Sequence, residues 1–194
     1  MAIALDYSYV SSNGGETSAV NKAIGVMNTV DMYFDDSFNT DVDFAIVEMF
    51  VSTCAQCDPS TWTSTLDALE LLNNFGTGAA GTSGFSTDFD LGQIWTNRNI
   101  EYEGNSYVVA LAWRPGVCYS KYHLLEDYTN NHNRLSTLTA HEIGYNFGSK
   151  HDTIPGHIMY SSVNGSGSWS QLSKDAINTV LSYASLSFRL RVLP

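Results

Sequence analysis

Residues 141–152 read HEIGYNFGSKHD, and they carry the strongest functional signal in the chain. On an α-helix, residues four apart share a face, so His141 and Tyr145 point the same way. Glu142 lies beside them. The segment therefore predicts a helix that presents two side chains of metal-ligand type together with one carboxylate.

A sharp turn is expected directly after this helix. Gly148 has no Cβ, so it can adopt backbone conformations that penalise other residues. Such a turn can bring His151 back against the helix face. Three ligands and one carboxylate would then converge on one point, as in a catalytic zinc site that keeps a fourth position open for water.

Strand and helix signals alternate upstream of this segment. Residues 3–10 alternate as a strand, and apolar residues recur at helical spacing over 17–35. Residues 42–51 are almost continuously apolar, as in a strand buried on both faces. A helix is expected over 59–75, with Gly76 just past its end. This order indicates an α/β layer on a largely parallel sheet.

Two more strands are expected before the helix at the motif. They cover 90–96 and 107–113, and the second fits an antiparallel strand at the edge of the sheet. Residues 118–134 show no clear period. The motif helix should run from Ser136 or Thr137 to residue 147, and Ser173 can cap a last helix.

The composition excludes several classes of protein. With 194 residues, 43% of them hydrophobic, the chain is long enough for one buried domain. Its formal charge of −11 argues against a nucleic-acid partner. No apolar run is long enough to span a membrane. The first residues show no signal peptide, so one is expected to be absent or removed. A low-charge surface rich in Ser, Thr and Asn favours secretion.

The motif resembles that of the metzincin zinc peptidases. HExxHxxGxxHD followed by a methionine turn is their signature, and the NFG and final aspartate of 141–152 are similar to the adamalysin/reprolysin branch. DLGQIWTNRNI (90–100) and ALAWRPGVC (110–118) are similar to the strand, connection and edge strand that precede its active-site helix. GHIMYSSV (156–163) looks like its methionine turn.

The resemblance implies an α/β (α+β) fold in a single domain over 1–194. It would contain a twisted mixed sheet of about five strands with an antiparallel edge strand, flanking helices, an active-site helix, a methionine turn and a C-terminal helix. Residues 1–148 would form an upper part and residues 149–194 a lower part. Disintegrin-like and cysteine-rich modules would be lacking.

The resemblance also implies a zinc-dependent endopeptidase with one catalytic Zn²⁺ ion. A metal-activated water would attack the peptide bond. The implied roles fall on His141 and His151 as zinc ligands, Glu142 as general base, and Gly148, Asp152 and Met159 as structural support of the site.

Tyr145 departs from the family pattern, because it stands where a second histidine ligand belongs. A phenol has a pKa near 10, so it must ionise or coordinate weakly. It can be a third zinc ligand, it can swing away and leave two histidines helped by His157, or it can pack as an aromatic in a site without metal. The alternative function is a degenerate domain that binds peptide or protein without cleaving it.

The partners follow from the same interpretation. A peptide or protein substrate would lie as an extended strand along 107–113, with 160–163 as one wall of the specificity pocket, and the protein would be a monomer without nucleic-acid partners. A structural Ca²⁺ near Asp6 and Asp90 is implied only by the resemblance. His123 and His132 are expected to face solvent.

Three cysteines allow at most one internal disulfide. Cys54 and Cys57 form CxxC, which fits a local disulfide or two free thiols. A CxxC oxidoreductase is a third functional class. The resemblance places the usual partner of Cys118 near the C-terminus, where no cysteine occurs, so Cys118 is expected to be unpaired.

Overall fold

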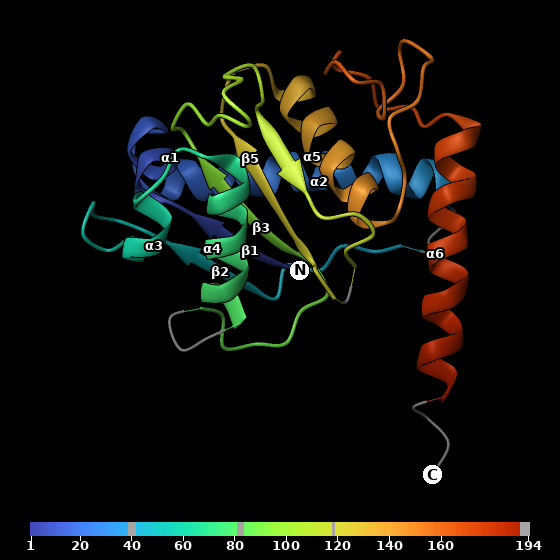
Figure 1. The fold of residues 1–194 in the computed structure, drawn as a ribbon, viewed down its shortest axis with the longest axis horizontal. Coiled ribbons are helices and arrows are strands. Elements are labelled where there is room, and N and C mark those ends of the chain that lie inside the picture. Colours follow the sequence, from blue (N-terminus) through green and yellow to red (C-terminus); the bar gives the residue numbers. More distant parts are fainter. Residues whose placement is uncertain (39–41, 81–83, 118, 191–194) are drawn as a thin grey trace.

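A computed structural model describes residues 1–38, 42–80, 84–117 and 119–190 (Figure 1). In chain order, its elements are β1 (Ala2–Leu5), α1 (Tyr7–Ser12), α2 (Glu16–Phe38), β2 (Glu48–Val51), α3 (Ser60–Thr63), α4 (Ala68–Ala80), β3 (Gly92–Thr96), β4 (Ala110–Ala112), β5 (Tyr122–Glu126), α5 (His132–Asn146) and α6 (Gln171–Leu190). The predicted mixed α/β fold in one domain is confirmed.

The sheet has the strand order β2-β1-β3-β5-β4. The pairs β1–β2, β1–β3 and β3–β5 are parallel, and β4 runs antiparallel to β5 at one end of the sheet. The predicted antiparallel edge strand is therefore confirmed, although it is shorter than 107–113.

Helices cover both faces of the sheet (Figure 1). Ile3, Trp95 and Leu125 point to the face that packs against α2 and α5. Ile94 and Leu124 point to the opposite face, which packs against α4. The alternation follows from the two-residue period of strand side chains. Because both faces are buried, the central strands need few polar residues.

The first two strands are shorter than the sequence predicts. The carboxylate of Asp6 accepts a hydrogen bond from the backbone N–H of Tyr9 at 2.8 Å, and this cap starts α1 where a strand was expected. β2 begins only at Glu48 and lies at the other edge of the sheet, where its residues are half-buried. The prediction of a strand buried on both faces over 42–51 was wrong.

The helix expected over 59–75 is two helices. Asp67 interrupts it, because its carboxylate accepts from the backbone N–H of Glu70 at 2.8 Å and caps α4. Gly76 lies inside α4, not past its end. A Cβ on Gly76 would come within 3.0 Å of the Tyr122 ring, so the glycine lets α4 approach β5 closely.

β5 was missed, because 118–134 shows no apolar period. All five of its residues are buried, but two of them are the polar His123 and Glu126. His123 is fully buried, so the expectation that it faces solvent was wrong; His132 is exposed as expected. α5 begins at His132, earlier than predicted, because the side chain of Asn131 caps it.

Three further findings concern the start of the C-terminal helix, the cysteines and the length of the apolar helices. The Oγ of Ser170 accepts from the backbone N–H of Ser173 and caps α6, so Ser173 is not the cap. Cys54 and Cys57 form a disulfide, and Cys118 lies outside the described residues. No helix within the described ranges is long and apolar enough to cross a bilayer.

Candidate metal centre

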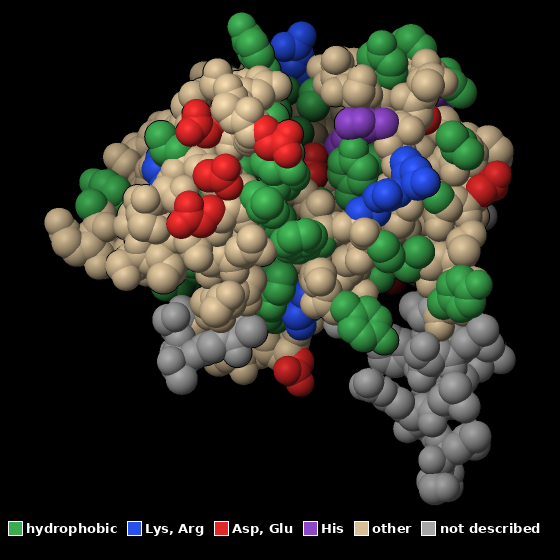
Figure 2. All heavy atoms as spheres, in the orientation of Figure 1, with side chains coloured by type: hydrophobic (Ala, Val, Ile, Leu, Met, Phe, Trp, Pro, Cys, Tyr) green, Lys and Arg blue, Asp and Glu red, His purple; other side chains and the backbone are tan. Residues whose placement is uncertain are grey.

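α5 positions the first part of the site. His141 and Tyr145 lie on its last two turns and share a face, as their spacing predicts. The helix ends just before Gly148, which has a φ of +86° in the left-handed region that favours glycine. The chain reverses there and brings His151 back to the same face. Figure 2 shows histidine side chains at the surface between α5 and the segment that follows this helix in Figure 1.

The three rings surround one point. The ring centroids of His141 and Tyr145 lie 5.0 Å apart, those of His141 and His151 5.1 Å, and those of Tyr145 and His151 5.4 Å. The two histidine Nε2 atoms face each other at 3.2 Å. Two nitrogen ligands on a tetrahedral zinc ion at 2.0–2.1 Å would be separated by about 3.4 Å. The pair thus has the spacing of two ligands on one ion.

The protonation of His141 suits a ligand. Its Nδ1 lies 2.7 Å from the carbonyl oxygen of Ile158, so Nδ1–H donates to that oxygen and Nε2 keeps its lone pair. Burial lowers the pKa of His141 to about 4. Burial also lowers the pKa of His151, with a smaller opposing effect from Asp152. Both imidazoles are therefore neutral at neutral pH, as metal ligands must be.

Glu142 is a buried carboxyl group with one oxygen that has no hydrogen-bond partner among the described residues. Its side chain is 4% exposed, and its Oε2 makes no hydrogen bond within the described part of the chain. Burial raises its pKa to about 8. Such an orphaned buried acceptor is rare unless a water, an ion or a reaction makes use of it.

Tyr145 is half-buried beside these groups. Burial raises the pKa of its phenol, the Glu142 carboxylate adds to the increase, and Arg114 opposes it. The phenol is therefore protonated without a cation, and a divalent metal is the kind of charge that can drive its ionisation.

A metal site with three protein ligands at this point would need the phenol of Tyr145 beside the two histidines. No three His, Cys, Asp or Glu side chains of the described residues come together to hold a metal. His157 consequently does not complete a set with His141 and His151. Tyr145 is the residue whose ring completes the group with His141 and His151.

Two supporting residues hold the returning chain. The backbone N–H of Asp152 donates to the carbonyl of Met159 at 2.9 Å, and its carboxylate accepts from Ile154 N–H and Ser173 Oγ at 3.1 and 3.3 Å. Met159 is fully buried. A Cβ on Gly144 would lie only 2.6 Å from the Met159 sulfur, so the methionine packs directly against α5.

Gly144 was not predicted to have a role, although a glycine inside the motif helix signals a close approach of this kind. The methionine sulfur occupies the space that a side chain on Gly144 would need. Gly144 therefore fixes how closely the turn at Met159 can approach the helix that carries the candidate ligands.

Gly148→Ala is expected to destabilise the protein by about 1–3 kcal/mol, because alanine is strained at positive φ. The new Cβ would also lie 2.9 Å from Cγ2 of Val180. Urea unfolding measures the loss. Gly156→Ala is the matched control, since Gly156 has a φ of +85° but, among the described residues other than its chain neighbours, no atom within 4 Å of its Cβ position. Equal losses in both variants would show that the contact with Val180 has no effect.

The implied calcium site is not formed. Asp6 follows the carboxyl end of β1, whereas Asp90 precedes the amino end of β3, and these strands are parallel. The two carboxylates therefore lie at opposite ends of the strands. Asp6 already accepts from Ser8 Oγ at 2.6 Å and from Arg98 Nε at 3.3 Å. A shared ion near both residues, as the resemblance implied, was a wrong expectation.

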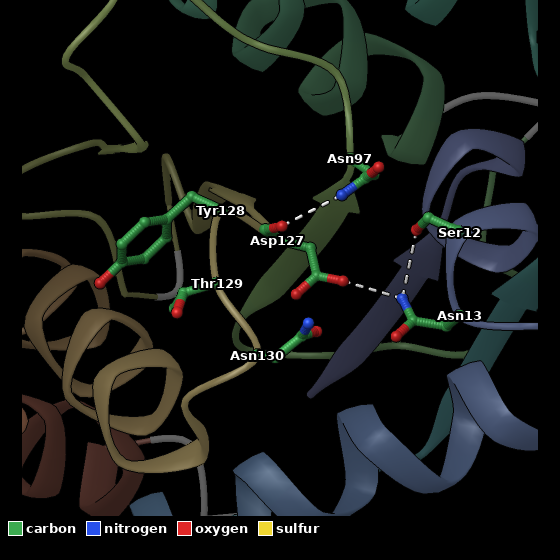
Figure 3. A pocket seen from close by; sticks show the side chains of 7 residues that line it. All are labelled: Ser12, Asn13, Asn97, Asp127, Tyr128, Thr129 and Asn130. Carbon is green, nitrogen blue, oxygen red and sulfur yellow. Dashed lines mark hydrogen bonds between the residues drawn. The ribbon is translucent and has the colours of Figure 1, made fainter.

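A separate polar cavity of about 250 Å³ lies where β3 and β5 end. Its lining comprises Ser12, Asn13, Asn97, Asp127, Tyr128, Thr129 and Asn130 (Figure 3). The Asp127 carboxylate accepts from Lys22 Nζ at 2.6 Å and from Asn13 Nδ2 at 2.8 Å. Its charge is thus compensated inside the protein, and the cavity does not share residues with the ring triad.

Comparison with protein families identifies the family of the chain. A reprolysin-type model of metallo-peptidase family M12 matches residues 1–190. The chain therefore belongs to this family, with the reprolysin-like metzincin fold, and it is a metallopeptidase domain by family. A search of curated proteins gave no match.

Proposed function

We propose that this protein is a zinc-dependent endopeptidase in which His141, Tyr145 and His151 hold the ion. The observation that carries the proposal is the pair of Nε2 atoms facing each other at 3.2 Å, with Tyr145 completing the triad of rings. Oxygen and nitrogen ligands both suit zinc, and three protein ligands leave a position for water.

Glu142 is the proposed general base. A zinc ion bound in such a site lowers the pKa of water and polarises the scissile carbonyl. Glu142 accepts the proton of the attacking water and passes it to the leaving amine. Burial raises the pKa of this carboxyl to about 8 in the metal-free protein, and the positive charge of a bound zinc ion would lower it toward the range in which the carboxylate can accept a proton. No hydrogen bond inside the described protein competes for Oε2.

The proposed substrate is an extended peptide that adds to β4. This strand pairs with β5 along one side and ends the sheet order, so its other side can offer backbone groups to a peptide. Residues 160–163, which follow Met159, would form one wall of the specificity pocket. The peptide along β4 and the pocket wall at 160–163 add detail to the general peptidase function of the family.

Export and a monomeric state belong to the same proposal. Only 15% of the residues are charged, and the Cys54–Cys57 disulfide fits an oxidising compartment. These observations support secretion.

Zinc addition to the metal-free protein is expected to raise its thermal midpoint. At a free concentration about 1,000 times the Kd, binding contributes about 4 kcal/mol, which is about 10 °C for a domain of this size. Calorimetry and elemental analysis measure the effect. Cleavage of an unfolded protein should stop with chelator and return with zinc, and His141→Ala should remove both responses.

Absence of both bound metal and chelator-sensitive cleavage would contradict the proposal. Metal or peptide binding without any cleavage would favour the degenerate binding domain instead. Thiol–disulfide exchange activity that survives chelation and depends on Cys54 and Cys57 would favour the oxidoreductase class.

A further inference from the structure

A polar pair interrupts the apolar face of the sheet beneath α5. Gln93 on β3 and His123 on β5 are register partners, and both are fully buried. The Nε2 of His123 lies 2.9 Å from the Gln93 side-chain oxygen, and its Nδ1 lies 2.9 Å from Oδ1 of Asn146. Two apolar residues would fill this face without the cost of burying polar groups. A buried polar pair at this position therefore calls for an explanation from the groups that it contacts.

Asn146, the last residue of α5, joins the helix to the edge of the sheet. Its Nδ2 donates to the carbonyl of Trp113 at 2.9 Å and to that of Tyr122 at 3.3 Å. Its own carbonyl accepts from the backbone N–H groups of Gly116 and Val117 at 2.8 and 3.0 Å. Trp113 follows β4 directly. One residue thus fixes where the edge strand leaves the sheet relative to the active-site helix.

These bonds determine the proton position on His123. Because Nδ2 of Asn146 serves two carbonyls, its Oδ1 must face His123, and only an Nδ1–H can donate to it. Burial lowers the pKa of His123 to about 4, so the ring is neutral and Nε2 carries a lone pair. Within the part of the chain that the structure describes, the NH₂ of Gln93 has no hydrogen-bond partner. A rotation of the Gln93 amide by about 180° exchanges its oxygen and nitrogen. The NH₂ then donates to Nε2 of His123, which gives both the NH₂ and Nε2 a hydrogen-bond partner.

We propose that Gln93, His123 and Asn146 act as positioning residues that hold β4 at the correct distance from α5 for an extended peptide. The chain of bonds orients the Asn146 amide from the sheet side, and Asn146 in turn holds the carbonyl of Trp113. The consequence for substrate rests on the proposed peptidase function. The positioning of β4 does not depend on it.

The first test is ¹⁵N NMR of the His123 ring in the wild-type protein. The expected result is a neutral ring with its proton on Nδ1 and a hydrogen-bonded, bare Nε2. A proton on Nε2 instead, or an imidazolium at neutral pH, would overturn the inference. This measurement needs neither metal nor peptidase activity.

The second test compares His123→Leu with Leu124→Ala. Leu124 is the next residue of β5, is equally buried and faces α4. Hydrogen exchange at the amides of Trp113, Gly116 and Val117 should become about 10-fold faster in His123→Leu than in the control, since one buried acceptor loses its donor. Equal exchange in the two variants would overturn the inference.

A third measurement concerns the substrate. In His123→Leu, KM for a long peptide should rise about 10-fold with little change in kcat, whereas Leu124→Ala should leave KM unchanged. An unchanged KM in His123→Leu would overturn the role in substrate alignment. A wild-type protein without peptidase activity would contradict the proposed function alone, because the NMR and exchange measurements still decide the positioning role.

Discussion

Glu142→Gln is expected to reduce peptide hydrolysis by about 10²–10⁴-fold and to leave zinc bound. Glutamine keeps the size of the side chain but cannot accept the proton of the attacking water. Steady-state cleavage of an unfolded protein gives the activity, and elemental analysis gives the zinc content. Loss of zinc together with activity would show that Glu142 helps to hold the ion instead.

The same substitution should stabilise the metal-free protein. The pKa of Glu142 is raised from about 4.5 to about 8 by burial, so the folded protein disfavours the carboxylate. Stability is therefore lost as the pH rises from 4.5 towards 8, and glutamine removes this loss. At pH 7 the gain is on the order of 3 kcal/mol, and it should vanish below pH 4.5.

Urea unfolding of the metal-free variants at pH 4 and pH 7 measures this gain. Glu126→Gln is the matched control, since Glu126 is also buried and its pKa is also raised by burial. However, its Oε2 accepts from the backbone N–H of Ile100 at 3.0 Å. The free energy of unfolding should therefore increase less in Glu126→Gln than in Glu142→Gln. A gain for Glu142→Gln that is the same at both pH values would contradict the explanation.

Tyr145→Phe is expected to weaken zinc binding by more than about 100-fold, because the loss of a direct ligand should exceed the 10–100-fold effect of residues behind the ligands. The fold should persist, since phenylalanine keeps the ring. Isothermal titration measures the affinity, and the near-ultraviolet absorbance of a tyrosinate should appear on zinc addition to the wild type only. Tyr128→Phe, which removes another buried hydroxyl, is the control.

Tyr145→His separates the remaining accounts of this residue. In a genuine His, Tyr, His site, activity falls on this change, and the pH optimum moves down because the anionic phenolate no longer raises the pKa of the water. Activity that appears only after the change would show a decayed site. Unaltered zinc affinity in Tyr145→Phe would remove the phenol from the ligand set.

Much of this structure could be predicted from local sequence patterns. The spacing of His141 and Tyr145 on a helix and the turn at Gly148 were sufficient to bring His151 into one group with them. The helical spacing and the turn both depend on residues that are close in sequence. The edge strand β4 was also predicted from its own apolar run.

The missed features depend on contacts between distant segments. β5 was hidden because His123 is polar, and its burial is possible only through Gln93 and Asn146, which lie far away in the sequence. The carbonyl of Ile158 that orients His141 could not be predicted from the motif either. Asp6 ended β1 early because its capping bond to Tyr9 competes with the strand.

The short length of β4 has a consequence for solubility. A sheet edge left open to unfolded chains can also pair with the edge of a second folded copy and begin aggregation. β4 has only three residues and spans about 10 Å. Such a short template gives two rigid edges few backbone bonds to share, whereas a flexible peptide can gain further contacts beyond the strand. Under the proposed function, the brevity of β4 would disfavour pairing between two folded copies while still allowing an extended peptide to add to the edge.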